Sequence, residues 1–435
     1  MRAFLSALIL VVSRLAPASA GDEFEQSPIN YSRTEPENCV SRLQHRIERG
    51  ETTLSFDERL GYLPSLLKSL EILPESQTLV FSKTSMQRDR ISPRTPRALY
   101  FNDDVYLGFC RGGDVLEIAV ADPNLGAVFY TLDQAAIEKP RFARQTDNCL
   151  LCHGSSQTDY VPGHRIRSVF VDRSGMPILS QGSTRVDHTT PLERRWGGWY
   201  VTGKHGAQTH LGNLVVADTS GSPPFDNRRG LNVTDLGDRF SVEDYLTPHS
   251  DLVALMVVEH QTLVHNLITK AGFGARQALH YDAEFHKALG EPAGERLEST
   301  TRRIHAAGDR LLEGLLFTDE APLQGPISGS TDYAERFAAV GPRDGRGRSL
   351  RDFDLQTRMF KYPCSYLIYS EPFDRLPDDL KRYVAARLRD ILTGKVQDAP
   401  FAHLSGEDRR AILEILQDTK PNLWPTDRPA SGVKP

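Results

Sequence analysis

Short runs of β-branched and aromatic residues alternate with turn-forming residues between about residue 77 and residue 217. The runs occupy 78–81, 98–101, 105–109, 115–120, 127–130, 168–171, 177–179, 199–202 and 211–217. Asp, Asn, Gly and Pro are frequent in the intervals, as at 122–126 and 172–175. Runs bounded in this way are typical of short β-strands joined by tight turns. We therefore expect successive strands over this stretch.

Helical spacing of apolar residues precedes and follows the predicted strands. Leucines recur at loosely helical intervals over 37–72, where Gly50, Gly61 and Pro64 interrupt the pattern. After a loop at 218–237, we expect a buried helix that begins near Ser250 and is ended by Gly272. Further helices are predicted at 280–289, 293–316, 350–361, 378–393 and 405–418, and 341–347 reads as an exposed linker. The last helix begins with a capping-box pattern, Ser405-x-x-Asp408.

These patterns predict a mixed α+β fold. The chain has 435 residues, which is more than one ordinary hydrophobic core usually fills. We expect an N-terminal helical segment at 21–74, a β-rich domain at 75–245 and a helical C-terminal domain at 246–435.

The first twenty residues have the pattern of a secretory signal peptide. Arg2 is followed by the apolar run 5–12, and Ala18-Ser19-Ala20 matches a cleavage site, so we expect cleavage after Ala20. This predicts a periplasmic or secreted protein with no integral membrane segment in the mature chain. The net charge of −5 gives no indication of a general affinity for nucleic acid.

The residues that carry chemistry are Cys149-Leu150-Leu151-Cys152-His153, a C-x-x-C-H pattern that attaches c-type haem. Two thiols on one short helical turn reach the two vinyl groups along one edge of the porphyrin. The adjacent imidazole then ligates the iron. A thioredoxin-like redox pair would be expected to open a helix after a strand, and a zinc site would need two more ligands at short spacing. A structural disulfide across two residues would be strained.

Cys149, Cys152 and His153 resemble the haem site of the cytochrome c superfamily. The resemblance implies one covalent haem c, with both cysteines binding the haem and His153 as the proximal iron ligand. It departs from small cytochromes c because strands, rather than helices, are predicted after His153. More loosely, the stretch from Leu79 to Tyr369 resembles large, mostly uncharacterised exported bacterial proteins with one such motif, on phrases such as those at 195–203 and 362–369.

The second axial position of the iron would decide between electron transfer and catalysis. Its candidate ligands are His164, Met176, His188, His205, His210, Met256 and His260. We single out His205, which lies in a glycine-flanked loop, and His260, which lies on the predicted buried helix. For each, the alternative is an ordinary histidine of a surface turn or of the core.

Several other side chains each have two possible roles. Glu259 is an acid–base group or a structural ion-pair partner. Trp196 and Trp199 line the haem or belong to the core. Four arginines are candidate partners of the haem propionates or are simply solvated: Arg165, Arg167, Arg194 and Arg195. Three further cysteines allow at most one disulfide of unassigned pairing: Cys39, Cys110 and Cys364.

The motif behind an export signal favours a periplasmic mono-haem protein that exchanges electrons with a redox partner protein. The length of the chain favours a second hypothesis, a peroxidase- or oxygenase-like haem enzyme with an open distal site. A third hypothesis is a haem-based sensor or adaptor. The sequence leaves open whether the protein is an enzyme.

Overall fold

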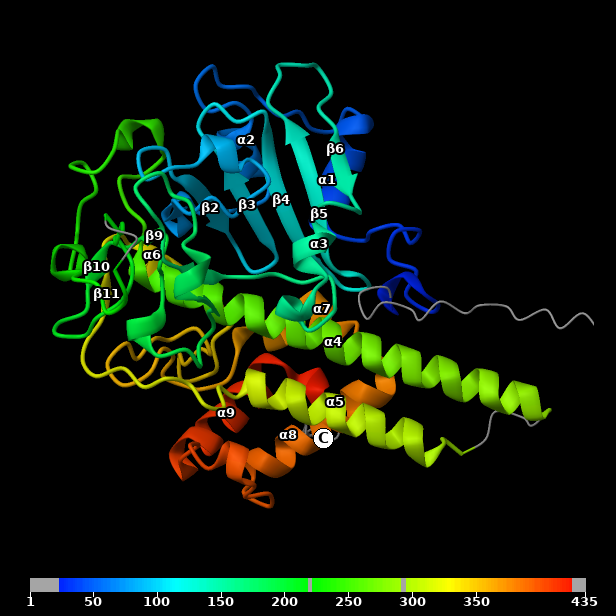
Figure 1. Ribbon diagram of the computed structural model, residues 1–435. Helices are drawn as coiled ribbons and strands as arrows, with labels where there is room; N and C mark the ends of the chain where they lie inside the picture. The colour runs from blue at the N-terminus through cyan, green and yellow to red at the C-terminus, as the bar shows by residue number, and fades with distance from the viewer. Residues whose placement is uncertain (1–22, 218–220, 291–294, 425–435) are drawn as a thin grey trace, which may run out of the picture.

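The computed structural model describes residues 23–217, 221–290 and 295–424, and the predicted signal peptide lies outside this range. A seven-stranded antiparallel sheet occupies the N-terminal half, and helices occupy the C-terminal half. The long helix α4 (Leu252–Leu289) runs beneath the sheet, with α5 (Glu298–Leu315), α8 (Asp378–Leu392) and α9 (Gly406–Thr419) below it (Figure 1). The predicted α+β class is therefore confirmed.

The sheet has the strand order β6-β5-β4-β3-β2-β1-β9. Its strands are β1 (Thr78–Val80), β2 (Arg97–Phe101), β3 (Val105–Phe109), β4 (Val115–Asp122), β5 (Gly126–Asp133), β6 (Phe142–Gln145) and β9 (Trp199–Tyr200). The first five predicted runs each form a strand, and β6 was not predicted. Two small pairs complete the β structure: β7 (Arg167–Val169) with β8 (Ser183–Arg185), and β10 (Gly203–Lys204) with β11 (Ser328–Gly329).

Two predicted strands are wrong. The run at 177–179 contributes only a single bridge, Val171 to Pro177, and β7 pairs instead with β8. The run at 211–217 is irregular because Asn213 has a φ of 65° and the amides of this segment bind scattered carbonyls, including that of Trp199. An apolar run is thus buried here without the regular partner that a strand needs.

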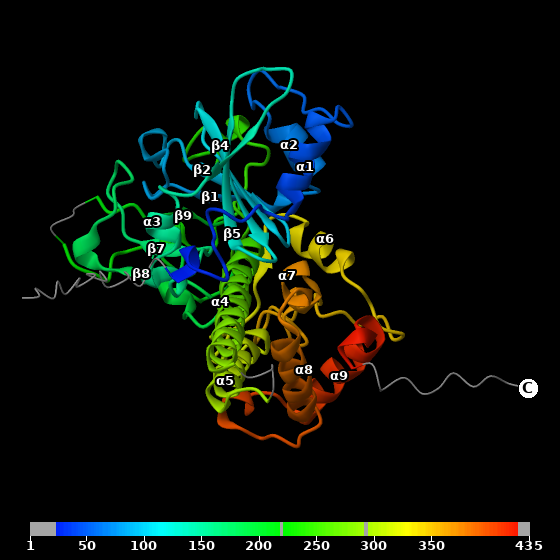
Figure 2. The ribbon, with the colours of Figure 1, turned by 90° about the vertical axis from the view of Figure 1, so that its right-hand side faces the viewer.

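The two faces of the sheet have different coverings. Alternate residues of β4, Leu116, Ile118 and Val120, face a hydrophobic cluster that includes α1 (Cys39–Glu48) and α2 (Leu63–Ser69). Figure 2 shows α1 and α2 on one side of the sheet and α3 (Leu150–His153), β7 and β8 on the other. The short helix that carries the C-x-x-C-H pattern therefore lies against the second face.

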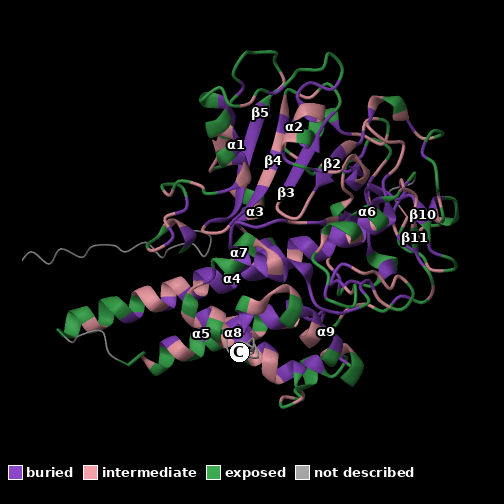
Figure 3. Ribbon diagram, turned by 180° about the vertical axis from the view of Figure 1, so that it is seen from behind, coloured by how far each residue is buried: buried purple, intermediate pink, exposed green. Residues whose placement is uncertain are grey.

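Helix α4 is longer than the sequence predicted. Its N-cap is Asp251 rather than Ser250, and it continues through Gly272 for 38 residues, taking in the separately predicted helix at 280–289. An interior glycine costs a helix roughly 1 kcal/mol. Packing offsets this cost because a Cβ at residue 272 would lie only 3.3 Å from a methyl of Leu376. The N-terminal half of α4 is buried almost all round (Figure 3).

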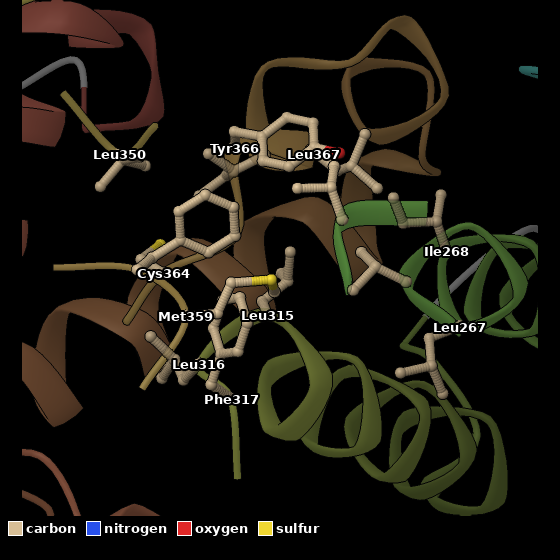
Figure 4. Close-up of a cluster of buried hydrophobic side chains, with 14 of the residues drawn as sticks. Leu267, Ile268, Leu315, Leu316, Phe317, Leu350, Met359, Cys364, Tyr366 and Leu367 are labelled. Atoms are coloured by element: carbon tan, nitrogen blue, oxygen red, sulfur yellow. The ribbon is translucent and has the colours of Figure 1, made fainter. Parts of the chain in front are cut away.

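The other helices of the C-terminal half pack with α4 around a second hydrophobic cluster. They are α5 (Glu298–Leu315), α6 (Tyr333–Val340), α7 (Glu371–Asp374), α8 (Asp378–Leu392) and α9 (Gly406–Thr419). Figure 4 shows side chains of α4, of the end of α5 and of residues 359–367 meeting in this cluster. The capping box of Ser405 and Asp408 is confirmed.

The helix predicted at 350–361 is wrong. Leu355 has a φ of 53°, and the Asp354 carboxylate accepts hydrogen bonds from the amides of Thr357 and Arg358, which closes a turn instead. Helix α6 was not predicted.

Helix α4 is, within the described ranges, the one helix long and apolar enough to cross a membrane. In its most apolar window 89% of the residues are buried inside the protein, as in the core helix of a soluble fold.

Candidate haem-attachment site

The two thiols and the imidazole of the C-x-x-C-H pattern project from one helical turn. The Cys149 carbonyl accepts hydrogen bonds from the amides of Cys152, at 3.2 Å, and His153, at 2.9 Å. The turn ends at Gly154, where a Cβ would lie 3.1 Å from both the Leu150 carbonyl and the Phe24 ring. The sequence prediction of a helical turn at this motif is confirmed.

The imidazole of His153 is held in a defined orientation. Its Nδ1 lies 2.9 Å from the Gly163 carbonyl oxygen, and the Gly163 amide donates to the His153 carbonyl at 2.8 Å. Because a carbonyl can only accept, Nδ1 carries the proton and Nε2 keeps its lone pair. The ring packs on Phe129 with 4.9 Å between centroids. Burial lowers the pKa of His153, so the imidazole is neutral at pH 7, the form that ligates metals.

Asn266 of α4 fixes the loop that holds His153. Its side-chain oxygen accepts from the His164 amide at 2.8 Å, and its side-chain nitrogen donates to the His164 carbonyl at 2.7 Å. A Cβ at Gly163 would lie 2.5 Å from that same oxygen, so only glycine fits here. The orientation of His153 therefore depends on a residue more than a hundred positions away in the sequence, which local patterns do not reveal.

All five cysteines lie within the described residues, and all five are free thiols. Cys152 is exposed and Cys149 is half-buried, and neither is bonded to another cysteine. The one disulfide that the sequence allowed does not form. Burial raises the pKa of the other three thiols, those of Cys39, Cys110 and Cys364, to about 12, so they remain protonated and unreactive.

A charged cluster that the sequence reasoning missed lies beside the motif. Arg97 of β2 reaches across Gly108 of β3 to Glu117 of β4, with 2.7 Å between Nη2 and Oε2. The hydroxyl of Ser85 and the amide of Gln87 donate to the other carboxylate oxygen, at 2.9 and 3.0 Å.

Burial alone would raise the pKa of Glu117, but Arg97 and these hydrogen bonds outweigh it and lower the pKa. Burial, together with the Glu117 charge, raises the pKa of Cys149 to about 11. The positive charge of Arg97 contributes to the lowered pKa of His153. The sequence does contain one indication of this cluster: Glu117 is an acidic residue within the otherwise apolar run 115–120.

His260 is fully engaged by protein groups. Its Nδ1 lies 2.9 Å from Nδ1 of His188, and its Nε2 lies 2.8 Å from the Ser365 hydroxyl. Its ring stacks on Phe317 with centroids 4.0 Å apart. It is neither hydrogen-bonded to His153 nor in ring contact with it, and the surroundings are those of a core histidine.

His205 directly follows β10, and Figure 1 shows β10 well to one side of α3. Its Nε2 accepts from the Asn232 amide at 2.9 Å, and its ring contacts His210 at 4.7 Å between centroids. His205 and His260 are thus both held by protein groups other than those of the motif. His164 does interact electrostatically with His153, and its Nε2 is buried without a hydrogen-bond partner.

The two methionine candidates differ in exposure. Met176 is exposed in its turn, and Met256 is buried in the core.

Glu259 is a structural partner rather than a free acid. Its carboxylate accepts from Arg195 at 2.9 Å and from the Trp196 indole at 2.5 Å, and all three side chains are buried. Arg195 is therefore committed to this pair. The Trp199 indole donates to the Arg167 carbonyl at 2.8 Å.

The four arginines proposed as propionate partners are therefore not equivalent. Arg194 is exposed and donates to the Thr184 hydroxyl. Arg165 interacts electrostatically with His153 and Cys152, and its Nε is buried without a hydrogen-bond partner. Arg165 is the candidate that the geometry favours.

Over the described ranges, no group of three or more His, Cys, Asp or Glu side chains is placed to hold a metal ion. Haem attachment needs no such group, because the porphyrin supplies four ligands and the protein supplies two thiols and one imidazole. No family model, curated protein or solved structure matches this chain.

Proposed function

We propose that this chain is an exported mono-haem c-type protein that exchanges electrons with a redox partner, with haem bound through Cys149 and Cys152 and with His153 on the iron. One observation carries the proposal: two free thiols and a neutral imidazole project from a single turn, with Nδ1 of His153 engaged and Nε2 left as the ligating atom. A haem held in this way supplies one-electron chemistry.

The surrounding residues have separate roles in this proposal. The Gly163 carbonyl fixes the imidazole and strengthens Nε2 as a ligand, as hydrogen-bond acceptors on the opposite ring nitrogen do for metal-bound histidines. Arg165, with its unpartnered Nε, suits a propionate carboxylate. The Glu117–Arg97 pair supplies a fixed dipole on the sheet face beside Cys149.

A haem enzyme with an open distal position is the second candidate. The observation that favours it is that both ring nitrogens of His260 and Nε2 of His205 are engaged by hydrogen bonds to protein groups, which leaves none of these three nitrogens free to ligate the iron. The sensor or adaptor hypothesis has no comparable observation in its favour.

Spectroscopy separates the two candidates. The chain is expressed with its export signal alongside a haem-maturation system, and absorbance spectra are recorded in both oxidation states, with and without carbon monoxide. A low-spin spectrum indifferent to carbon monoxide supports electron transfer. A high-spin ferric form that binds cyanide and reacts with peroxide supports the enzyme and would contradict the electron-transfer proposal.

A further inference from the structure

Three segments of the chain meet around the C-x-x-C-H turn: the β1–β2 loop at 82–97, residues 149–160 with α3, and the β7–β8 region at 160–186. Ser85 and Gln87 of the first segment bind Glu117 beside Cys149. The Lys83 amide donates to the Gly175 carbonyl at 2.9 Å, which joins the first segment to the third. We call the surface of these three segments the motif face.

The motif face is cationic although the protein is acidic. Residues 82–97 and 160–186 contain nine Lys or Arg and two Asp or Glu, whereas the whole chain has a net charge of −5. Within the described residues, six of these cations have no carboxylate partner, and Arg165 among them is the one assigned above to a propionate: Lys83, Arg88, Arg94, Arg165, Arg167 and Arg173. The negative charge of the chain must therefore lie elsewhere on the molecule.

The same face exposes large apolar side chains. Of the eleven large hydrophobic residues exposed in the described ranges, five lie on these segments: Met86, Leu151, Tyr160, Met176 and Leu179. Leu151, between the two cysteines, is 78% exposed, and Leu179 is 65% exposed. Exposed apolar side chains among charged groups are typical of protein–protein interfaces.

We propose that the motif face is the docking surface for a redox partner protein with an acidic surface patch. This inference rests on the proposed function. The cations steer an acidic partner toward the turn that carries the exposed Cys152, and the apolar side chains provide the contact once the partner arrives. A nucleic acid would use the charge without needing this set of apolar side chains, and an anionic membrane, which would use both features, is a competing outcome of the binding test below.

The sign of the salt dependence tests this directly in the haem-loaded protein. Stopped-flow rates are measured with ferricyanide, an anionic oxidant, and with hexaammineruthenium, a cationic reductant. Ionic strength is raised from about 0.01 M to about 1 M, which shortens the screening length from roughly 30 Å to 3 Å. We expect the ferricyanide rate to fall about tenfold or more while the hexaammineruthenium rate rises. The reverse order, which the net charge of −5 alone would give, would overturn the proposal.

Charge-reversal variants locate the effect. Arg88→Glu/Arg94→Glu changes two exposed residues of the motif face, and Arg303→Glu/Arg410→Glu makes the same charge change on α5 and α9. The first variant should abolish or invert the salt dependence with ferricyanide, and the second should leave it unchanged. Equal effects of the two variants would contradict a local surface.

A binding measurement separates this inference from the proposed function because it needs no haem. Poly-L-glutamate is titrated into the full-length apo chain and into both variants, with duplex DNA and phosphatidylserine vesicles as competitors. We expect poly-L-glutamate to bind and the Arg88→Glu/Arg94→Glu variant to lose about tenfold or more in affinity. Equal binding to both variants, or tighter binding of DNA or vesicles, would overturn the docking proposal whether or not the chain carries haem.

Discussion

Asn266 offers a quantitative test of how the fold holds the candidate ligand. Its amide makes two hydrogen bonds to the backbone of His164, at 2.8 and 2.7 Å, and the side chain is buried. Asn266→Ala leaves a buried N–H and a buried C=O without partners, each at a cost of about 1–3 kcal/mol. We therefore expect the free energy of unfolding to fall by about 4 kcal/mol, near the middle of that combined range.

Urea unfolding followed by circular dichroism measures this change. Asn266→Asp keeps the acceptor for the His164 amide but turns a buried carboxylate oxygen toward the His164 carbonyl oxygen, so its loss at pH 7 should be at least as large. Lys270→Ala, at an exposed position one turn further along α4, is the matched control and should change stability by less than about 0.5 kcal/mol.

A local readout distinguishes clamping of the loop from a general loss of packing. Hydrogen exchange of the Gly163 and His164 amides should speed up in Asn266→Ala more than exchange at the centre of the sheet, because the loop opens locally. A stability change below about 0.5 kcal/mol would refute the reasoning that Asn266 fixes the segment that orients His153. Uniformly faster exchange would refute it as well.

Three further predictions concern the rest of the fold. Glu259→Ala should destabilise the protein by about 3–5 kcal/mol in urea unfolding because it leaves Arg195 charged and buried without its partner, and a loss below about 1 kcal/mol would contradict this. Burial lowers the pKa of His210 to about 3 and that of His265 to about 4. The unfolded chain therefore takes up protons first as pH falls below 6.5, and stability measured at pH 5 should be lower than at pH 8 by about 2 kcal/mol for each histidine. Stability that is flat across this range would show that these histidines are not buried in the neutral form. Ser405→Ala removes the N-cap of α9 and should lower the free energy of unfolding by about 1 kcal/mol. An unchanged melting temperature would contradict this.

The strands of the first half of the sheet were predictable because each consists of a short apolar run followed by a turn, and the information is local. The continuation of α4 through Gly272 was not predictable, because contacts with Leu376 outweigh the local preference of glycine to end a helix. The helix prediction at 350–361 is wrong for the opposite reason. Its apolar spacing suggests a helix, but the carboxylate of Asp354 closes a turn that spacing alone does not encode.

In the candidate site, too, the residues that are adjacent in sequence were predictable and those brought in by tertiary packing were not. Cys149, Cys152 and His153 are neighbours in sequence, so their arrangement on one turn could be predicted. Gly163 and Asn266, which orient the imidazole, are brought to His153 only by tertiary packing. The histidines proposed as second ligands were chosen for local features, a glycine-flanked loop and a buried helix, which say nothing about distance from His153.

Covalent attachment of haem is the central claim, and it is tested most directly by the mass of the denatured protein. The chain is exported in cells that carry a haem-maturation system, denatured, and analysed by intact mass and by haem-stained denaturing gel, beside a Cys149→Ser/Cys152→Ser variant. We expect a mass increase of one haem on the cleaved native-sequence protein, a stained band that survives acid–acetone, and neither in the variant. A colourless product, or haem removed by acid–acetone, would contradict it.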